Sequence, residues 1–216
     1  MKVVISCSNK KNGESLIFNS NEILFVANPQ KTEIINNKIY YHPDEKINNT
    51  NKTWREYVIE NQSAFLKAYE LYFNDIYRKL YSSFGSDLFI LSAGWGIVNS
   101  EFNLPKYDIT FSKQAEEYKR RTKKIYFNDF NHLKNISPNE DIVAFIGIDY
   151  IGLFYELTKD LTNKKIIFYN SKKLSEIKKA VKQNETYHFK KYQTNIRTNW
   201  HYVAAKDFLN GKLDYE

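Results

Sequence analysis

Six segments of the chain carry the pattern of β-strands. Five are runs of apolar and β-branched residues, which are typical of strands buried on both faces of a sheet. They span residues 2–7, 23–27, 88–92, 142–148 and 165–170. A sixth segment, 186–191, alternates polar and apolar positions, so we expect it at the edge of a sheet.

Between these strands, apolar residues recur at the spacing of helices. The pattern predicts helices over residues 54–81, 112–130, 151–161, 171–183 and 200–209, and it leaves open a break near Gln62. Thr53 and Ser171 are suited to cap two of them. Residues 30–53 are polar and look irregular. The alternation of strands and helices predicts one α/β domain over residues 1–216, with a mostly parallel central sheet covered by helices on both faces.

Polar clusters follow several of these strands. Because the carboxyl ends of parallel strands share one edge of a sheet, ligands bind there in open α/β folds. The clusters are Ser6 to Lys11, Ser92 to Gly96, Asp149-Tyr150 and Asn170-Ser171. We therefore expect a crevice in which Asp108 and Asp149 lie near the loop from Ser8 to Lys10.

Each candidate residue also has a structural interpretation. Asp108 is either a reactive carboxylate or the cap of a turn, and Asp149 either faces the crevice or caps the helix that follows it. Trp95, between two glycines, either stacks on a base or closes the core, and Arg55 shares this ambiguity. Cys7 is either a nucleophile or buried packing. Three further polar residues near the C-terminus are able to return to the crevice: Arg197, Asn199 and His201.

Composition limits the kinds of partner that the protein is expected to bind. The net charge of +7 and pI near 9.1 favour an anionic partner, nucleic acid first, although an AT-rich genome would also enrich lysine and asparagine. The single cysteine, Cys7, excludes a disulfide within the chain and indicates a reducing, cytoplasmic compartment. The sequence contains no apolar run long enough to cross a membrane. His42 and His132 lack partner ligands at helical spacing, so we expect neither a metal nor a cofactor.

Four stretches resemble a known family. They are ISCSNKK at 5–11, HPDEKINNTNKTWREYV at 42–58, ILSAGWGIVNSEFNLPKYDITFS at 90–112 and Trp-His-Tyr at 200–202. These stretches, distributed over most of the length of the chain, resemble small bacterial proteins of the DUF6884 type. That family is similar to the uracil-DNA-glycosylase-like domain of archaeosine synthase, and some members are anti-phage glycosylases that excise modified cytosines from phage DNA.

The resemblance implies a uracil-DNA-glycosylase-like fold and a DNA glycosylase that leaves an abasic site. The chain lacks the Gly-x-Asp-Pro-Tyr and His-Pro-Ser motifs of true uracil-DNA glycosylases, so it does not imply a uracil substrate. Nor does it imply tRNA, because the chain has no room for an RNA-binding domain. The partner it implies is DNA with a modified base extruded from the duplex.

These considerations lead to three hypotheses. In the first, a glycosylase uses Asp108, with Asp149 second, as the catalytic carboxylate. Its substrate-binding residues are Cys7, Ser8, Asn9, Lys10, Trp95, Tyr107 and Arg55. A basic helix contributes contacts to the DNA backbone from Lys119, Arg120, Lys123 and Lys124, which make the affinity salt-dependent. In the second, the same crevice of a non-catalytic sensor module binds a free nucleotide. In the third, a metal-dependent nuclease uses Asp44, Glu45 and Asp108.

Overall fold

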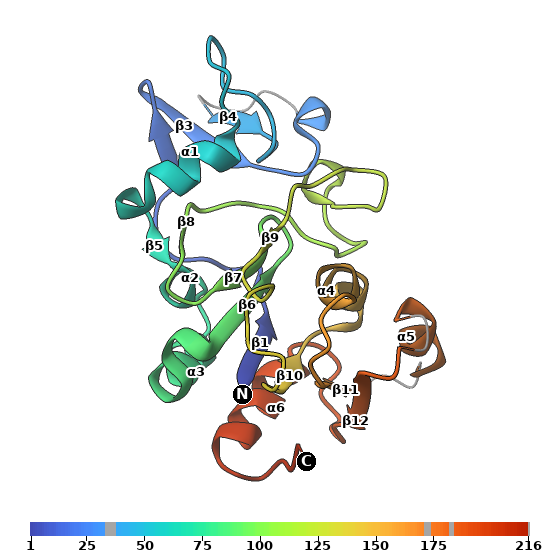
Figure 1. The fold of residues 1–216 in the computed structure, drawn as a ribbon. Coiled ribbons are helices and arrows are strands. Elements are labelled where there is room, and N and C mark those ends of the chain that lie inside the picture. Colours follow the sequence, from blue (N-terminus) through green and yellow to red (C-terminus); the bar gives the residue numbers. More distant parts are fainter. Residues whose placement is uncertain (33–37, 171–173, 182–183, 216) are drawn as a thin grey trace.

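The central sheet of the protein contains strands from both halves of the chain. The structure, a computed structural model, describes residues 1–32, 38–170, 174–181 and 184–215. Within these ranges, seven strands pair in the order β12-β11-β10-β1-β6-β7-β9 (Figure 1). The first five run parallel, β7 is antiparallel to β6, and β9 is parallel to β7. The mostly parallel sheet is confirmed. Its strands are β1 (Lys2–Ser6), β6 (Leu88–Ser92), β7 (Gly96–Asn99), β9 (Phe130–Asn131), β10 (Ile142–Phe145), β11 (Lys165–Tyr169) and β12 (Tyr187–Lys191).

Helices cover both faces of this sheet. Because successive side chains of a strand point to opposite faces, Val3 and Ile5 pack with α3 (Ile76–Phe84) and α6 (Trp200–Leu209), whereas Val4 packs with α4 (Ile151–Thr158) and α5 (Leu174–Ala180). The α/β fold class predicted from the sequence is therefore confirmed. Ser171, the predicted cap of α5, lies outside the described residues. Along the described ranges, no helix has the length and apolarity needed to cross a membrane.

A second sheet lies beyond the central one. It contains β2 (Leu16–Phe18), β3 (Asn21–Phe25) and β4 (Lys38–Tyr41), and α1 (Trp54–Glu60) packs on it (Figure 1). The predicted strand 23–27 belongs to this sheet. The prediction that residues 30–53 are irregular is wrong in part, because β4 pairs in parallel with β3. Trp54 joins α1 to this sheet through ring contacts with Phe18 of β2 and Phe25 of β3.

The predicted helix over 54–81 is broken. Thr53 forms the expected capping box with Glu56, but α1 ends at Glu60. The break follows at η2 (Gln62–Ala64), where the side-chain amide of Gln62 exchanges hydrogen bonds with the backbone of Asn103. This contact fixes Gln62 on another segment instead of continuing the helix. The chain then forms β5 (Leu66–Lys67), which pairs with β8 (Asn103–Leu104), followed by α2 (Ala68–Leu71), α3 and η3 (Gly85–Asp87).

The predicted helix over 112–130 is wrong. This segment forms a loop that contains the short 3-10 helix η4 (Glu117–Lys119) and ends where β9 begins, at Phe130. Its backbone bonds to other segments: the Tyr118 carbonyl accepts the N–H groups of Ala27 and Asn28, and the Asn28 side chain donates to the Arg120 carbonyl. These tertiary bonds occupy carbonyls that a helix would use internally.

Two other short 3-10 helices complete the structure, η1 (Pro29–Lys31) and η5 (Ile148–Tyr150). The strand predicted over residues 142–148 ends earlier, at Phe145, and the 3-10 helix η5, which contains Asp149, begins at residue 148. The prediction that Asp149 caps α4 is wrong, because Tyr150 occupies the cap position and no side chain bonds there. Asp149 is therefore available to the crevice.

The turn between β6 and β7 depends on Gly96. Its φ of +87° lies in the left-handed region, and an added Cβ would come within 2.3 Å of the Phe130 carbonyl oxygen. We expect Gly96→Ala to lower the free energy of unfolding by roughly 3 kcal/mol, since strain and overlap add. Denaturant unfolding measures this loss. Gly211→Ala is the control, because Gly211 also has a positive φ, +68°, but open space around it. Equal losses for both variants would contradict the packing argument.

Candidate functional site

A crevice of about 610 Å³ opens at the carboxyl ends of β1, β10 and β11. Three of the predicted polar clusters meet there, through Ser6 to Asn9, Asp149-Tyr150 and Asn170. The shared edge of a parallel sheet brings them together, as expected. The fourth predicted cluster, Ser92 to Gly96, lies inside the protein with all its side chains buried.

The loop after β1 forms one wall. Cys7 lines the crevice although the residue is only 7% exposed, and its Sγ lies 3.2 Å from the Tyr150 hydroxyl. Ser8 and Asn9 also line it, and Ser8 Oγ donates to the Lys10 carbonyl. These three predicted substrate-binding residues are therefore at the crevice. Lys10 points elsewhere, with its amine 3.8 Å from the centre of the Phe73 ring.

Behind this wall lies a group of buried hydroxyls. Tyr107 shares hydrogen bonds with Ser92 Oγ at 2.8 Å and with the Tyr72 hydroxyl at 2.9 Å. Burial raises the pKa of Tyr72, Tyr107 and Tyr150 well above its usual range, so these phenols stay neutral. The prediction that Tyr107 binds the substrate is wrong, because the residue is 2% exposed and does not line the crevice. It supports the wall instead.

Trp95 is a core residue. It is 0% exposed and packs edge-on against Phe25 at 5.4 Å between ring centres. The turn that carries it is tied down by Ser92, whose Oγ accepts the N–H groups of Gly94 and Trp95. Because this turn folds back beneath the second sheet, the prediction that Trp95 faces the crevice and stacks on a base is wrong.

The two candidate carboxylates have different surroundings. Asp108 forms an ion pair with Lys119 at 2.9 Å, and Thr110 and Ser112 are the residues of its segment that line the crevice. Asp149 is exposed and lines both the crevice and a neighbouring cavity. Among the described residues, none forms a hydrogen bond or an ion pair with the Asp149 carboxylate. The structure thus favours Asp149 over Asp108, the reverse of the order expected from the sequence.

The neighbouring cavity, of about 920 Å³, is lined by five cationic side chains and by three acidic ones, Asp129, Asp149 and Glu156. Its apolar floor includes Phe111 and Leu153, and its cationic side chains are Lys113, Arg120, Arg121, Lys123 and Lys179. Two of the four predicted DNA-backbone residues, Arg120 and Lys123, therefore lie beside the crevice. The other two do not: Lys119 pairs with Asp108 and Glu116, and Lys124 lines a third cavity.

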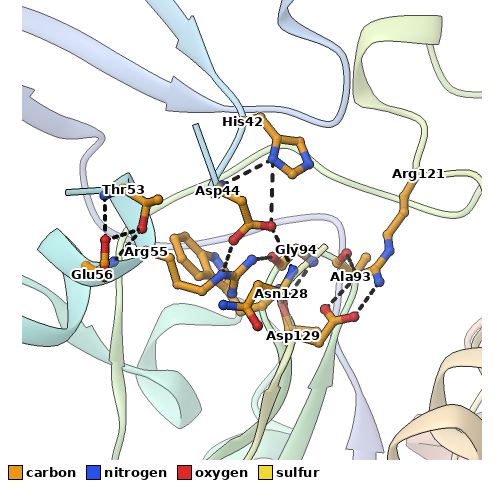
Figure 2. Close-up of polar contacts among 12 residues, drawn as sticks. His42, Asp44, Thr53, Arg55, Glu56, Ala93, Gly94, Arg121, Asn128 and Asp129 are labelled. Atoms are coloured by element: carbon orange, nitrogen blue, oxygen red, sulfur yellow. Dashed lines mark hydrogen bonds and ion pairs between the residues drawn. The ribbon is translucent and has the colours of Figure 1, made fainter. Parts of the chain in front are cut away.

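Arg55 lies in a buried cluster under the second sheet (Figure 2). Its Nε donates to Asp44, its Nη2 donates to the Gly94 carbonyl at 3.4 Å, and the residue is 2% exposed. The other oxygen of Asp44 accepts the Asn128 N–H. The prediction that Arg55 binds substrate is wrong, because the guanidinium holds residues 42–56 against the turn before β7.

A second buried ion pair completes this cluster. Arg121 binds both carboxylate oxygens of Asp129 and donates to the Ala93 carbonyl (Figure 2). Two of the three carboxylates required by the nuclease hypothesis also form ion pairs, Asp44 with Arg55 and Asp108 with Lys119. In the described part of the chain, no three His, Cys, Asp or Glu side chains gather closely enough to hold a metal ion.

The segment before α6 forms the opposite wall. Residues 194–202 line the crevice, including Arg197, Asn199 and His201, as the sequence suggested. Sequence reasoning missed Tyr150 as the partner of the Cys7 thiol, and it also missed Thr110 and Ser112. These residues have ordinary polar or aromatic character in the sequence, and only the fold brings them to the crevice.

His201 is half-buried, and its buried Nε2 atom has no hydrogen-bond partner among the residues that the structure describes. Burial lowers the pKa of His201 to about 4 from 6.5. Because the unfolded chain binds this proton more readily, the neutral histidine contributes stability above about pH 6.5 that is lost as the pH falls to about 4. The difference is of order 3 kcal/mol. We expect the free energy of unfolding of His201→Phe, measured by urea denaturation, to depend less on pH over this window than that of the wild type. An equal dependence on pH in both proteins would contradict the lowered pKa of His201.

No protein-family model matches the chain, and comparisons with curated proteins and with solved structures find no match. The resemblance to the DUF6884-type family, and with it the uracil-DNA-glycosylase-like fold, therefore stays a prediction.

Proposed function

We propose that the protein is a DNA glycosylase that hydrolyses the N-glycosidic bond of a modified base. The observation that carries the proposal is the position of Asp149, a carboxylate with no partner among the described residues, which lines both a polar crevice and a cavity with several cationic side chains. A carboxylate at this position is able to stabilise a sugar that develops positive charge. The cationic side chains beside it are able to bind the phosphates on either side of that sugar.

The residues of the crevice and of the neighbouring cavity have different roles in this reaction. As the bond to the base breaks, positive charge develops on the sugar, and the Asp149 carboxylate stabilises this charge and orients the attacking water. Ser8 and Asn9 on one wall, with Asn199 on the other, offer hydroxyl and amide groups to the polar edge of the extruded base. Arg120 and Lys123 bind the adjacent backbone.

The resemblance of the sequence gives the proposal its biological setting. It implies modified cytosines of phage DNA as the bases excised, and defence against phage as the role. It adds DNA as the partner and agrees with the cytoplasmic location inferred from the single cysteine. No cofactor enters this reaction.

The test is excision from defined DNA. Purified protein is incubated with phage DNA that carries modified cytosines and with the same sequence carrying ordinary cytosine, and abasic sites are counted with an aldehyde-reactive probe. We expect abasic sites in the modified DNA alone. If no modified DNA gains abasic sites while a mononucleotide raises the melting temperature, the protein is a nucleotide-binding module and the proposal fails.

A further inference from the structure

The cavity beside the crevice has an apolar floor that the proposed hydrolysis leaves unused. Four half-buried side chains form this floor: Phe111, Ile125, Leu153 and Leu157. The volume of about 920 Å³ lies within the roughly 300–1,000 Å³ that is typical of small-molecule sites. Apolar surface gathered in such a hollow favours a ligand with an apolar part, and the Phe111 ring offers a face on which a base can stack.

The charges around this floor favour an anion. Of the three acidic residues, Asp129 pairs with Arg121 and Glu156 with Lys159, which leaves Asp149 at the edge shared with the crevice. The remaining cations are Lys113, Arg120, Lys123 and Lys179. This excess of positive charge is complementary to a phosphate group.

A thin wall separates the cavity from the crevice. Thr110 and Ser112 line the crevice, whereas Phe111, between them in the sequence, lines the cavity. The Phe111 ring packs edge-on against Tyr150, which lines the crevice, at 5.0 Å between ring centres. Because Asp149 lines both hollows, the two meet at this residue, as two adjacent nucleotides of one strand would require.

The loop that carries Arg120 and Lys123 is fixed to other segments. The Arg121 N–H donates to the Thr110 carbonyl at 2.8 Å, and its guanidinium donates to the Ala93 carbonyl at 2.9 Å. The Asn28 side chain donates to the Arg120 carbonyl at 3.1 Å. A wall that is already ordered favours binding, because the loop loses little conformational freedom when a ligand enters.

We propose that this cavity is a second nucleotide site, which takes a base against Phe111 and a phosphate among the cations around it. Stacking on an aromatic ring is tolerant of sequence, so the site accepts any of the four bases. The nucleotide has one of two sources, a free mononucleotide or the neighbour, on the same strand, of the base in the crevice. The second source rests on the proposed function, whereas the first does not.

Photo-crosslinking with 5-iodouracil tests this inference, since the irradiated base loses its iodine and bonds to an aromatic ring in contact with it. The protein is irradiated with 5-iodo-2′-deoxyuridine 5′-monophosphate, and separately with a short single strand that carries one 5-iodouracil and no modified cytosine. We expect peptide mass spectrometry to place the adduct on Phe111, with a yield that saturates with probe and falls as salt rises. An adduct from the mononucleotide identifies a free nucleotide as the ligand, and an adduct from the strand alone identifies the neighbouring nucleotide of DNA.

Two glycines provide matched variants that fill one hollow each. Gly152 lines the cavity and Gly147 lines the crevice, and a Cβ added at either position meets open space without the strain of a positive φ. We expect Gly152→Leu to lose most of the mononucleotide adduct on Phe111 and Gly147→Leu to keep it. Melting temperatures show that both variants fold.

Adjacent lysines test the role of charge. Lys123 lines the cavity, whereas Lys124 lines a third cavity. We expect Lys123→Gln to raise the probe concentration at half-saturation by up to about five-fold, the range for an exposed charge pair, and Lys124→Gln to leave it unchanged.

The outcomes separate this inference from the proposed glycosylase. No adduct with either probe, an adduct confined to crevice residues such as His201 or Tyr202, or a mononucleotide adduct on Phe111 that is undiminished in Gly152→Leu overturns the second site. A protein that excises modified bases but forms no adduct on Phe111 is a glycosylase with the crevice alone. An adduct on Phe111 that Gly152→Leu removes, in a protein that excises no base, supports the second site while the proposed glycosylase fails.

Discussion

Replacing Asp149 with asparagine is expected to reduce excision of a modified base by about 100- to 10,000-fold. The amide has nearly the shape of the carboxylate but carries no charge to set against the oxocarbenium ion. Because Asp149 is exposed and without a partner among the described residues, its replacement should leave the melting temperature unchanged. The measurement is the single-turnover rate of abasic-site formation on modified phage DNA.

Asp108→Asn is the matched control for this experiment. The Asp108 carboxylate pairs with Lys119, so the variant loses an ion pair on the loop after β8 but no charge that faces the crevice. We expect an excision rate within a few-fold of the wild type, since a partly exposed ion pair contributes little. If Asp108→Asn is as inactive as Asp149→Asn, the preference for Asp149 is wrong.

Much of the fold could be predicted because its strands are buried on both faces. Residues 88–92 and 165–169 are apolar at nearly every position, a pattern that indicates a strand covered on both sides. Helix α6 occurs at the predicted residues, 200–209, because its apolar positions recur at helical spacing and pack against the sheet. In both cases the side chains that form the apolar pattern in the sequence are the ones that the fold buries.

Prediction failed where partners distant in sequence determine the conformation. The segment 112–130 has residues that favour a helix, but its backbone bonds to Ala27 and Asn28, some 90 positions away. No local pattern contains that information. The same holds for Trp95, whose neighbouring glycines suggest an exposed loop although the turn is covered by Phe25 of the second sheet.

The position of the candidate site could be predicted from the sequence, but the choice of its catalytic carboxylate could not. The expectation that strand ends share an edge brought Cys7, Asn9 and Asp149 together correctly. The preference between the two aspartates could not be predicted, since it depends on whether Lys119 reaches Asp108. The sequence predicts that this lysine lies in a basic helix, whereas the loop that replaces the helix brings it to Asp108. Thus one error in secondary structure changed the choice of the catalytic residue.

Arg55→Met is expected to lower the free energy of unfolding by about 3–5 kcal/mol. The substitution removes the guanidinium from a site where 2% of the residue is exposed, and it leaves one oxygen of Asp44 without its partner. For a protein of this length, such a loss corresponds to a fall in melting temperature of roughly 10 °C. Calorimetry measures both quantities. Lys52→Met, which breaks the exposed ion pair with Glu60, is expected to change stability by at most about 1 kcal/mol.

Adding Asp44→Leu to Arg55→Met distinguishes a lost interaction from an uncompensated charge. If most of the loss comes from the unpaired carboxylate, the double variant recovers stability relative to Arg55→Met, and the double-mutant cycle gives a coupling of about 1–3 kcal/mol. The recovery is expected to be incomplete, because Asp44 also accepts the Asn128 N–H and so joins the loop after β4 to the segment before β9. Losses that simply add would show that Arg55 acts through its contacts with Trp95 and Phe130, and that the charge of Asp44 does not hold the two sheets together.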